Sequence, residues 1–213
     1  MNVLELFAGT RSIGKAFERK EHNVFSVDWN KEFKDIDLYF DIGKLTSDYI
    51  LKCFGKPDVI WASPDYTSYS VAGIYHHRRK DKLTGSLEPI SEYAMFCDSV
   101  NQNVLKLIND LNPTFYFIEN PRGAMRKMSW MKDLPRYTVT YCQYGDTRMK
   151  PTDIWTNHPN PKFKPPCKQG APCHIPAPRG SQTGTQGLKS CVDRAVIPLE
   201  LCNHIVNICE EYL

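Results

Sequence analysis

Long apolar runs are absent from this sequence, and so is a strong excess of charge of one sign. No stretch approaches the roughly 20 apolar residues that cross a membrane as a helix, so no membrane association is expected. The first residues hold no basic region followed by an apolar stretch, so no secretory signal is visible and a cytoplasmic location is expected. The formal net charge of +3 is too small to select nucleic acid over other partners.

Internal repeats are absent too, and 213 residues are enough for one core but not for two ordinary domains. We therefore expect one domain and a monomer. Eight cysteines are scattered at positions 53, 97, 142, 167, 173, 191, 202 and 209. In a chain expected to be intracellular, reduced thiols are the default interpretation.

Strand and helix patterns alternate along the first 120 or so residues, as expected for an α/β protein. Apolar runs predict buried strands over residues 1–8, 23–28, 57–62 and 114–119, and helical periodicity occurs at 12–19 and 91–111. This alternation predicts a doubly wound, mostly parallel sheet. Strand-like segments at 137–143 and 152–156 would add an antiparallel hairpin, and an apolar-periodic run to residue 213 predicts a C-terminal helix.

Candidate ligand-binding residues follow the predicted strands, because ligands of open parallel sheets sit beyond the carboxyl ends of the strands. After the first strand, Gly9 lets the backbone approach a ligand, and the following helix start can receive a carboxylate. After the second, Asp28 suits ribose hydroxyls and Trp29 suits stacking on adenine. Asp41 is a further polar residue, expected near the edge of the adenine ring. Ordinary chain reversal at Gly9, and simple element ends at Asp28 and Asp41, are the alternatives.

Five segments carry a family resemblance because they occur in one order. They are Leu4-Glu5-Leu6-Phe7-Ala8-Gly9, Asp28-Trp29, the Ser63-Pro64 loop, Glu119-Asn120-Pro121-Arg122-Gly123 and Ile197-Pro198-Leu199-Glu200-Leu201. Together they resemble successive motifs of the cytosine-5 DNA methyltransferases, over nearly the whole chain. The resemblance is to the small bacterial and phage enzymes of DNA modification.

The resemblance implies a Rossmann-like methyltransferase fold with a seven-stranded sheet, S-adenosylmethionine as cofactor and double-stranded DNA as partner. It divides the chain into a catalytic core (1–157), a small irregular target-recognition segment (158–190) and a C-terminal helix that packs back on the core (191–213). The residues it assigns to the cofactor are Phe7, Ala8, Gly9, Thr10, Asp28, Trp29, Asp41 and Ile42.

The catalytic loop departs from the family at the nucleophile. In the family a cysteine thiolate attacks carbon 6 of a flipped cytosine while a glutamate holds ring nitrogen 3. Glu119 matches that glutamate, but the loop is Ser63-Pro64-Asp65-Tyr66, with Tyr66 at the position of the thiol. A phenol, with a pKa of about 10, is largely protonated at neutral pH and less nucleophilic than a thiolate.

Two interpretations of Tyr66 follow. Enzymes that methylate exocyclic amines carry a Ser/Asp/Asn-Pro-Pro-aromatic loop at this place, which Ser63-Pro64-Asp65-Tyr66 resembles apart from Asp65. Such a transfer needs no covalent intermediate. Alternatively, the chain is an inactivated relative that binds DNA and cofactor and masks sites or regulates. Methylation of RNA or of a free nucleotide is a third possibility, because the target-reading segment is short.

Base and DNA contacts are expected from residues with polar or cationic side chains. By resemblance, or from the basic stretches 76–82 and 122–132, these are Asn120, Arg122, Arg148, Lys150, Arg78 and Arg79, with Arg179 from the irregular segment. The basic stretches are equally consistent with solvated faces.

Zinc is not expected, because Cys167, Cys173 and His174 are only three neighbouring ligands and a structural zinc site needs four. Ordinary buried thiols and an exposed histidine are the favoured interpretation. Cys202 and His204 would join them only if the final helix returned there.

Overall fold

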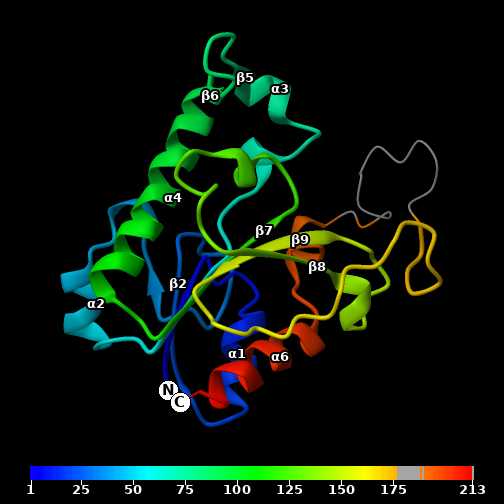
Figure 1. The fold of residues 1–213 in the computed structure, drawn as a ribbon. Coiled ribbons are helices and arrows are strands. Elements are labelled where there is room, and N and C mark those ends of the chain that lie inside the picture. The colour runs from blue at the N-terminus through cyan, green and yellow to red at the C-terminus, as the bar shows by residue number, and fades with distance from the viewer. Residues whose placement is uncertain (177–187, 189, 213) are drawn as a thin grey trace.

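A seven-stranded sheet with helices on both faces organises the chain (Figure 1). The computed structural model describes residues 1–176, 188 and 190–212. The sheet order is β3-β2-β1-β4-β7-β9-β8. The strands are β1 (Asn2–Leu6), β2 (Asn23–Asp28), β3 (Leu38–Tyr39), β4 (Val59–Ala62), β7 (Phe115–Pro121), β8 (Arg136–Thr140) and β9 (Pro151–Thr156). The predicted fold class is confirmed.

The sheet is parallel except at β9, which runs antiparallel to both β7 and β8. Its central strands are buried on both faces, as parallel strands covered by helices require. In β4, Ile60 packs into the core on one face of the sheet while Trp61 packs into the core on the other. The β8–β9 pair is the antiparallel hairpin that the sequence predicts.

Helices cover the two faces of the sheet in two separate layers (Figure 1). On one face, α1 (Ser12–Glu18) packs against α6 (Leu199–Glu210) over a core that includes Phe17 and Ile205. On the other lie α2 (Ser47–Cys53) and α4 (Glu92–Leu111). Helix α4 begins where the Ser91 side chain accepts a hydrogen bond from the Ala94 N–H, and it ends at Asn112 in the left-handed region.

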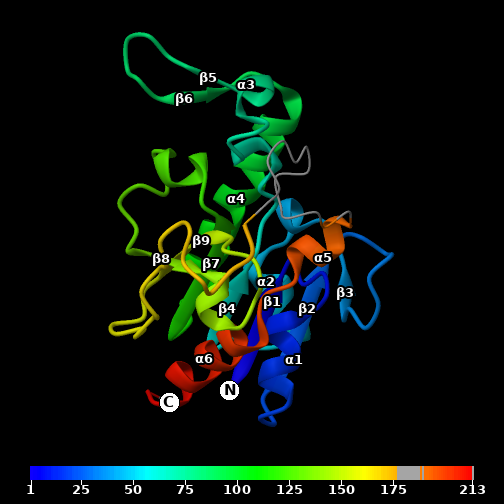
Figure 2. The same ribbon diagram turned by 90° about the vertical axis from the view of Figure 1, so that its right-hand side faces the viewer.

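A two-stranded hairpin, β5 (Arg78–Lys80) with β6 (Leu87–Pro89), follows the short helix α3 (Ile74–His77). Figures 1 and 2 both show it beyond one end of α4, on the opposite side of the molecule from α1 and α6. No sequence pattern predicted this hairpin, nor α2, β3 and the short helix α5 (Cys191–Ala195).

The short 3-10 helices include η1 (Ile42–Lys44), η2 (Thr67–Tyr69), η3 (Ala124–Lys127) and η4 (Tyr141–Tyr144). The strand predicted over 137–143 ends earlier, because the chain turns into η4 and reverses at Gly145, whose φ is 84°. From 157 to 176 the chain holds neither helix nor strand. In the part of the chain that the structure describes, no helix is both long and apolar enough to span a bilayer.

Candidate active site

The predicted site residues meet at one edge of the sheet, where parallel strands end. Strand register places Leu6 beside Ala62 and Ala62 beside Ile118. The next residues along β4 and β7, Ser63 and Glu119, therefore lie side by side at the carboxyl edge.

Asp28 ties the end of β2 to the turn that follows β1. Its Oδ2 accepts a hydrogen bond from the Gly9 N–H at 2.9 Å, and its Oδ1 accepts one from the Asn30 N–H at 2.8 Å. A carboxylate offers about four acceptor sites, so two are left for hydroxyl donors of a ligand. Trp29 is 71% exposed, which leaves the indole open for stacking.

The turn after β1 has an irregular backbone, with φ of 56° at Phe7 and 49° at Gly9. A side chain at Gly9 would be strained in this left-handed region. The rest of the segment has structural partners: Ala8 is buried, and the Thr10 hydroxyl lies 2.9 Å from that of Ser12.

A carboxyl group of the chain itself occupies the start of α1. Glu5 is buried, and its Oε1 accepts a hydrogen bond from the Gly14 N–H at 2.9 Å. Burial raises the Glu5 pKa to about 7, against the lowering effect of the Gly14 N–H. The sequence predicted that the start of this helix can receive the carboxylate of a ligand. For the Gly14 N–H this prediction is wrong, because Glu5 already accepts its hydrogen bond.

Asp41 and Ile42 form the start of η1. The Asp41 Oδ1 accepts a hydrogen bond from the Gly43 N–H at 2.9 Å, and the Asp41 side chain is partly exposed. Ile42 is buried, so only its backbone is available to a ligand.

The loop after β4 is held in place from β7. The buried Asn120 donates from Nδ2 to the Pro64 carbonyl oxygen at 2.9 Å. Asp65 is exposed, and its Oδ1 accepts a hydrogen bond from the Thr67 N–H at 2.6 Å. Tyr66 is half-buried, and among the described residues its hydroxyl has no hydrogen-bond partner.

Glu119 is a buried carboxyl group at the end of β7. Burial raises its pKa, while the Lys150 charge and hydrogen bonds from Tyr141 and Ser63 act in the opposite direction. The Tyr141 hydroxyl donates to Glu119 Oε1 at 3.1 Å. Burial therefore extends the protonated form of this carboxyl group to higher pH, and a protonated carboxyl group can donate a hydrogen bond.

Lys150 lies beside the same carboxyl group. Its Nζ stands 4.4 Å from the centre of the Tyr141 ring and donates to the Arg194 carbonyl oxygen at 2.9 Å. Burial lowers the Lys150 pKa, and the nearby Glu119 opposes that effect.

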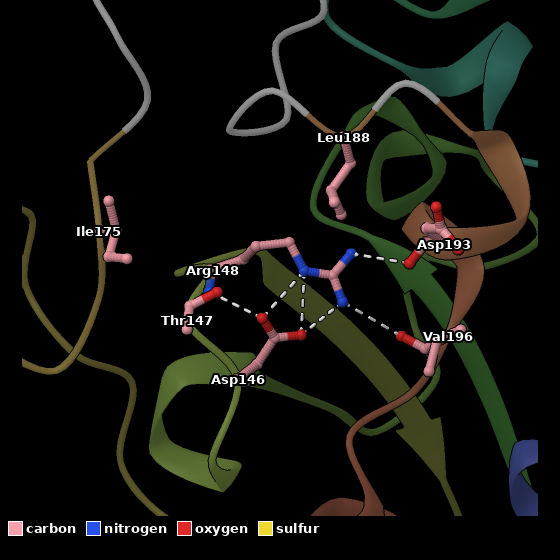
Figure 3. Close-up of a pocket in the computed structure, with 7 residues that line it drawn as sticks. All are labelled: Asp146, Thr147, Arg148, Ile175, Leu188, Asp193 and Val196. Carbon is pink, nitrogen blue, oxygen red and sulfur yellow. Dashed lines mark hydrogen bonds and ion pairs between the residues drawn. The ribbon is translucent and has the colours of Figure 1, made fainter.

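Arg148, whose guanidinium carbon lies 5.9 Å from the centre of the Tyr141 ring, is engaged by other groups of the chain, contrary to its predicted role in holding the base. It is buried and ion-paired with Asp146, and its guanidinium also donates to the carbonyl oxygens of Asp193 and Val196 (Figure 3). These partners raise its pKa, chiefly through Asp146. Arg148 thus fastens the loop before β9 to the segment that precedes α6.

Arg78 is likewise not available to DNA. Its guanidinium is fully buried, forms an ion pair with Asp98 at 2.6 Å, and lies 4.3 Å above the Tyr69 ring. Arg79 and Arg122 are exposed, as a DNA contact requires. Arg179 lies outside the described residues.

A groove of about 640 Å³ runs between the β5–β6 hairpin and the segment that follows β7. One wall holds Lys127, Trp130 and Lys132, and residues 84–89 of the hairpin form the other. The groove therefore takes Lys127 and Lys132 from the basic stretch 122–132, while its hairpin wall consists of residues that follow the basic stretch 76–82 in sequence.

Sequence reasoning missed three residues that the structure brings into view. Tyr141 lay inside a predicted strand, and the family resemblance gave no reason to single it out. Glu5 was named only as part of the first motif, without a role of its own. Cys142 lies beside Cys167, Cys173 and His174, which corrects the expectation of too few ligands for a metal. His174 is buried, not exposed as expected.

The chain is similar in sequence to a Frog virus 3 (isolate Goorha) protein named "Probable DNA (cytosine-5)-methyltransferase". The two are 29% identical over an alignment of 171 residues that covers 74% of this chain and 71% of the viral protein. No protein-family model matches the chain.

Solved structures share its fold. A protein assigned as a DNA modification methyltransferase, encoded within a prophage in E. coli, matches with a TM-score of 0.54 and 16% identity, over 73% of this chain and 46% of that one. The methyltransferase EhMeth of Entamoeba histolytica matches with a TM-score of 0.50 and 16% identity, over 73% and 52%. The chain spans about half the length of these structures.

The chain thus shares the Rossmann-like sheet of these solved methyltransferase structures. The resemblance to cytosine-5 DNA methyltransferases, predicted from the motifs, is confirmed by the viral relative.

Proposed function

We propose that this chain is an S-adenosylmethionine-dependent DNA methyltransferase of cytosine-5 lineage that holds a flipped cytosine against Glu119. The observation that carries the proposal is the placement of Glu119, a buried carboxyl group with a raised pKa, beside the loop that Asn120 ties down at Pro64. The proposal assigns catalysis to residues 1–157, target contacts to 158–190 and support of the core to 191–213.

The cofactor site lies at the ends of β1 and β2. S-adenosylmethionine, when bound, would supply an electrophilic methyl group. Asp28 retains two acceptor sites for ribose hydroxyls, and the exposed Trp29 ring is free to stack on adenine. Asp41 adds a partly exposed carboxylate at the same edge, while Gly9 keeps the backbone clear of side-chain bulk.

The base site is built around the protonated form of Glu119. In that form its carboxyl group can donate to ring nitrogen 3 of cytosine, which draws electron density from the ring and makes carbon 6 more electrophilic. The Tyr141 hydroxyl donates to this carboxyl group, and the Lys150 charge acts on it. Tyr66, at the position of the family's thiol, would line the pocket with its ring.

In one form of the function, the methyl group goes to the exocyclic amine of the base. Ser63, the Pro64 carbonyl and the Asp65 carboxylate are acceptors on the loop that can orient amine protons. This form needs no thiolate, which agrees with a phenol at position 66.

The alternative is a relative that binds cofactor and DNA without transfer and so masks sites or regulates. One observation favours it: a Glu119 carboxyl that donates to ring nitrogen 3 withdraws electron density from the exocyclic amine and makes that amine a poorer nucleophile. Cys97 does not replace the missing thiolate, because burial, and secondarily the Asp65 charge, raise the pKa of its thiol.

DNA is proposed to contact the groove between the β5–β6 hairpin and the segment after β7. Lys127 and Lys132 line the groove, and the exposed Arg79 lies on the hairpin. Such charges release counterions from DNA on binding, so affinity should fall with rising salt.

Incubating the protein with labelled S-adenosylmethionine and double-stranded DNA, followed by nucleoside mass spectrometry, separates these forms. A methylated exocyclic amine supports transfer by the unaltered chain, and binding of both ligands without a modified nucleoside supports the inactive relative. If RNA or free nucleotides were labelled and DNA was not, the substrate would be RNA or a nucleotide and the proposed DNA substrate would be wrong. No S-adenosylmethionine binding by calorimetry would overturn the proposal as a whole.

A further inference from the structure

Four side chains that carry metal-ligating atoms converge on one point away from Glu119. They are Cys142, Cys167, Cys173 and His174, and one ligand atom from each lies within 4.8 Å of the other three. Cys142 Sγ lies 3.1 Å from Cys167 Sγ and 3.5 Å from Cys173 Sγ. His174 Nδ1 lies 3.6 Å from Cys167 Sγ and 3.7 Å from Cys173 Sγ.

These separations suit the corners of a small tetrahedron. With Zn–S bonds of about 2.3 Å, the sulfur atoms of a tetrahedral zinc site stand about 3.8 Å apart, and sulfur-to-nitrogen separations are slightly shorter. A disulfide would instead hold two sulfur atoms at about 2.05 Å. The group is therefore more compatible with a shared metal than with a disulfide bond.

The ligands come from two distant parts of the chain. Cys142 lies in η4, directly after β8, and the other three belong to the segment without helix or strand, 157–176. Hydrogen bonds from two backbone N–H groups hold that segment in place. The Cys167 N–H donates to Thr140 Oγ1 at 2.9 Å, and the Ile175 N–H donates to the Thr147 carbonyl oxygen at 2.8 Å.

The segment has little apolar burial to hold it otherwise. Most residues from 164 to 176 are exposed or half-buried, while Cys142 and His174 are buried at the cluster. Where a segment lacks a hydrophobic core, metal binding can supply the free energy that folds it.

We propose that Cys142, Cys167, Cys173 and His174 bind one zinc ion. Three thiolates and one imidazole complete a closed tetrahedral set, with no open position for substrate, so the site is structural. It fastens the segment 157–176 to η4, close in sequence to the loop that carries Arg148 and Lys150. The assignment does not depend on the methyltransferase function, because none of its ligands belongs to the cofactor or base site.

Metal content of the full chain, purified from cells supplied with zinc and without chelator, is the direct test. We expect one zinc per chain by mass spectrometry of the metal. Replacement by cobalt should give the thiolate-to-metal charge-transfer and intense visible bands of a tetrahedral sulfur-rich site.

Variants then identify the ligands. Cys173→Ser and His174→Ala should lose the metal and become cleavable by protease within 157–176, whereas His174→Cys should retain it. Cys53→Ser, an exposed cysteine in α2, is the matched control and should keep both metal and protease resistance.

Two results would overturn the assignment: a folded, unaltered chain that holds no zinc and takes up none when titrated under reducing conditions, or a Cys142–Cys167 disulfide found by peptide mapping of the protein kept in reductant. Because the first measurement uses the unaltered protein, failure of a variant to fold does not affect it.

Discussion

Tyr141 donates its hydroxyl hydrogen to Glu119 Oε1 at 3.1 Å from a ring that is itself fully buried. The donor stabilises the charged carboxylate, so it holds the Glu119 pKa below the value that burial alone would give. The pair therefore influences the pH range in which the proposed donation from Glu119 to a base can occur.

Removing this donor should shift that range. In Tyr141→Phe, the Glu119 pKa is expected to rise further, because burial is unchanged and one opposing hydrogen bond is lost. The protonated carboxyl group should then persist to higher pH. Infrared titration of the carboxyl band, taken as a difference against Glu119→Gln, measures this shift. A downward shift, or no shift at all, would contradict the assigned environment.

Cofactor affinity should depend on Trp29. Loss of a stacking partner in Trp29→Ala is expected to cost about 0.5–1.5 kcal/mol, or roughly two- to tenfold in the dissociation constant of S-adenosylmethionine. Calorimetry on Tyr75→Ala, which removes an aromatic ring from α3 that is 69% exposed, provides the control. Equal effects of the two substitutions would argue against a cofactor at the end of β2.

Neighbouring arginines on the hairpin should behave in opposite ways. Arg79→Met should leave stability nearly unchanged and reduce the salt dependence of DNA binding by about one unit of slope. Arg78→Met should leave Asp98 unpaired and lower the free energy of unfolding by about 3–5 kcal/mol. Urea unfolding and salt-dependent binding measure the two effects. If Arg78→Met left stability intact, the buried ion pair would not have the importance that we assign to it.

The free energy of unfolding should fall as the pH rises from about 4.5 to about 7, because of Glu5. Its folded-state pKa, about 7, lies above its ordinary value of 4.5, so in this range the folded chain holds a proton that the unfolded chain has lost. Rising pH therefore favours the unfolded chain, with a total effect on the order of 3 kcal/mol. Urea unfolding at several pH values should show a shallower decline in Glu5→Gln. If the free energy of unfolding fell as steeply with pH in Glu5→Gln as in the unaltered chain, this role of Glu5 would be excluded.

The parallel strands of the sheet were accessible from the sequence, because buried parallel strands leave continuous apolar runs. The segment 23–28 is an example, since β2 covers the same residues. Its end at Asp28 lies at the carboxyl edge of the sheet as predicted, because a polar residue after such a run stands at that edge.

The pairing of charged and metal-ligating side chains was not accessible from the sequence. Arg78 belongs to a basic stretch that suggests contact with DNA, and Arg148 was placed near the base by resemblance, yet each is ion-paired with an aspartate, Asp98 and Asp146 respectively. Arg78 and Asp98 are 20 residues apart, and no local pattern reports such pairing. For the same reason Cys142 was not connected with Cys167, which lies 25 residues further along the chain.

The central claim is that position 66 is the nucleophile position of a cytosine-5 site that is otherwise assembled. The most direct test is to incubate Tyr66→Cys with DNA and S-adenosylmethionine and to measure 5-methylcytosine by mass spectrometry, with Tyr66→Ser and the unaltered chain in parallel. We predict 5-methylcytosine from Tyr66→Cys alone. Its formation by the unaltered chain, or its absence from a folded Tyr66→Cys protein that binds both ligands, would contradict the account.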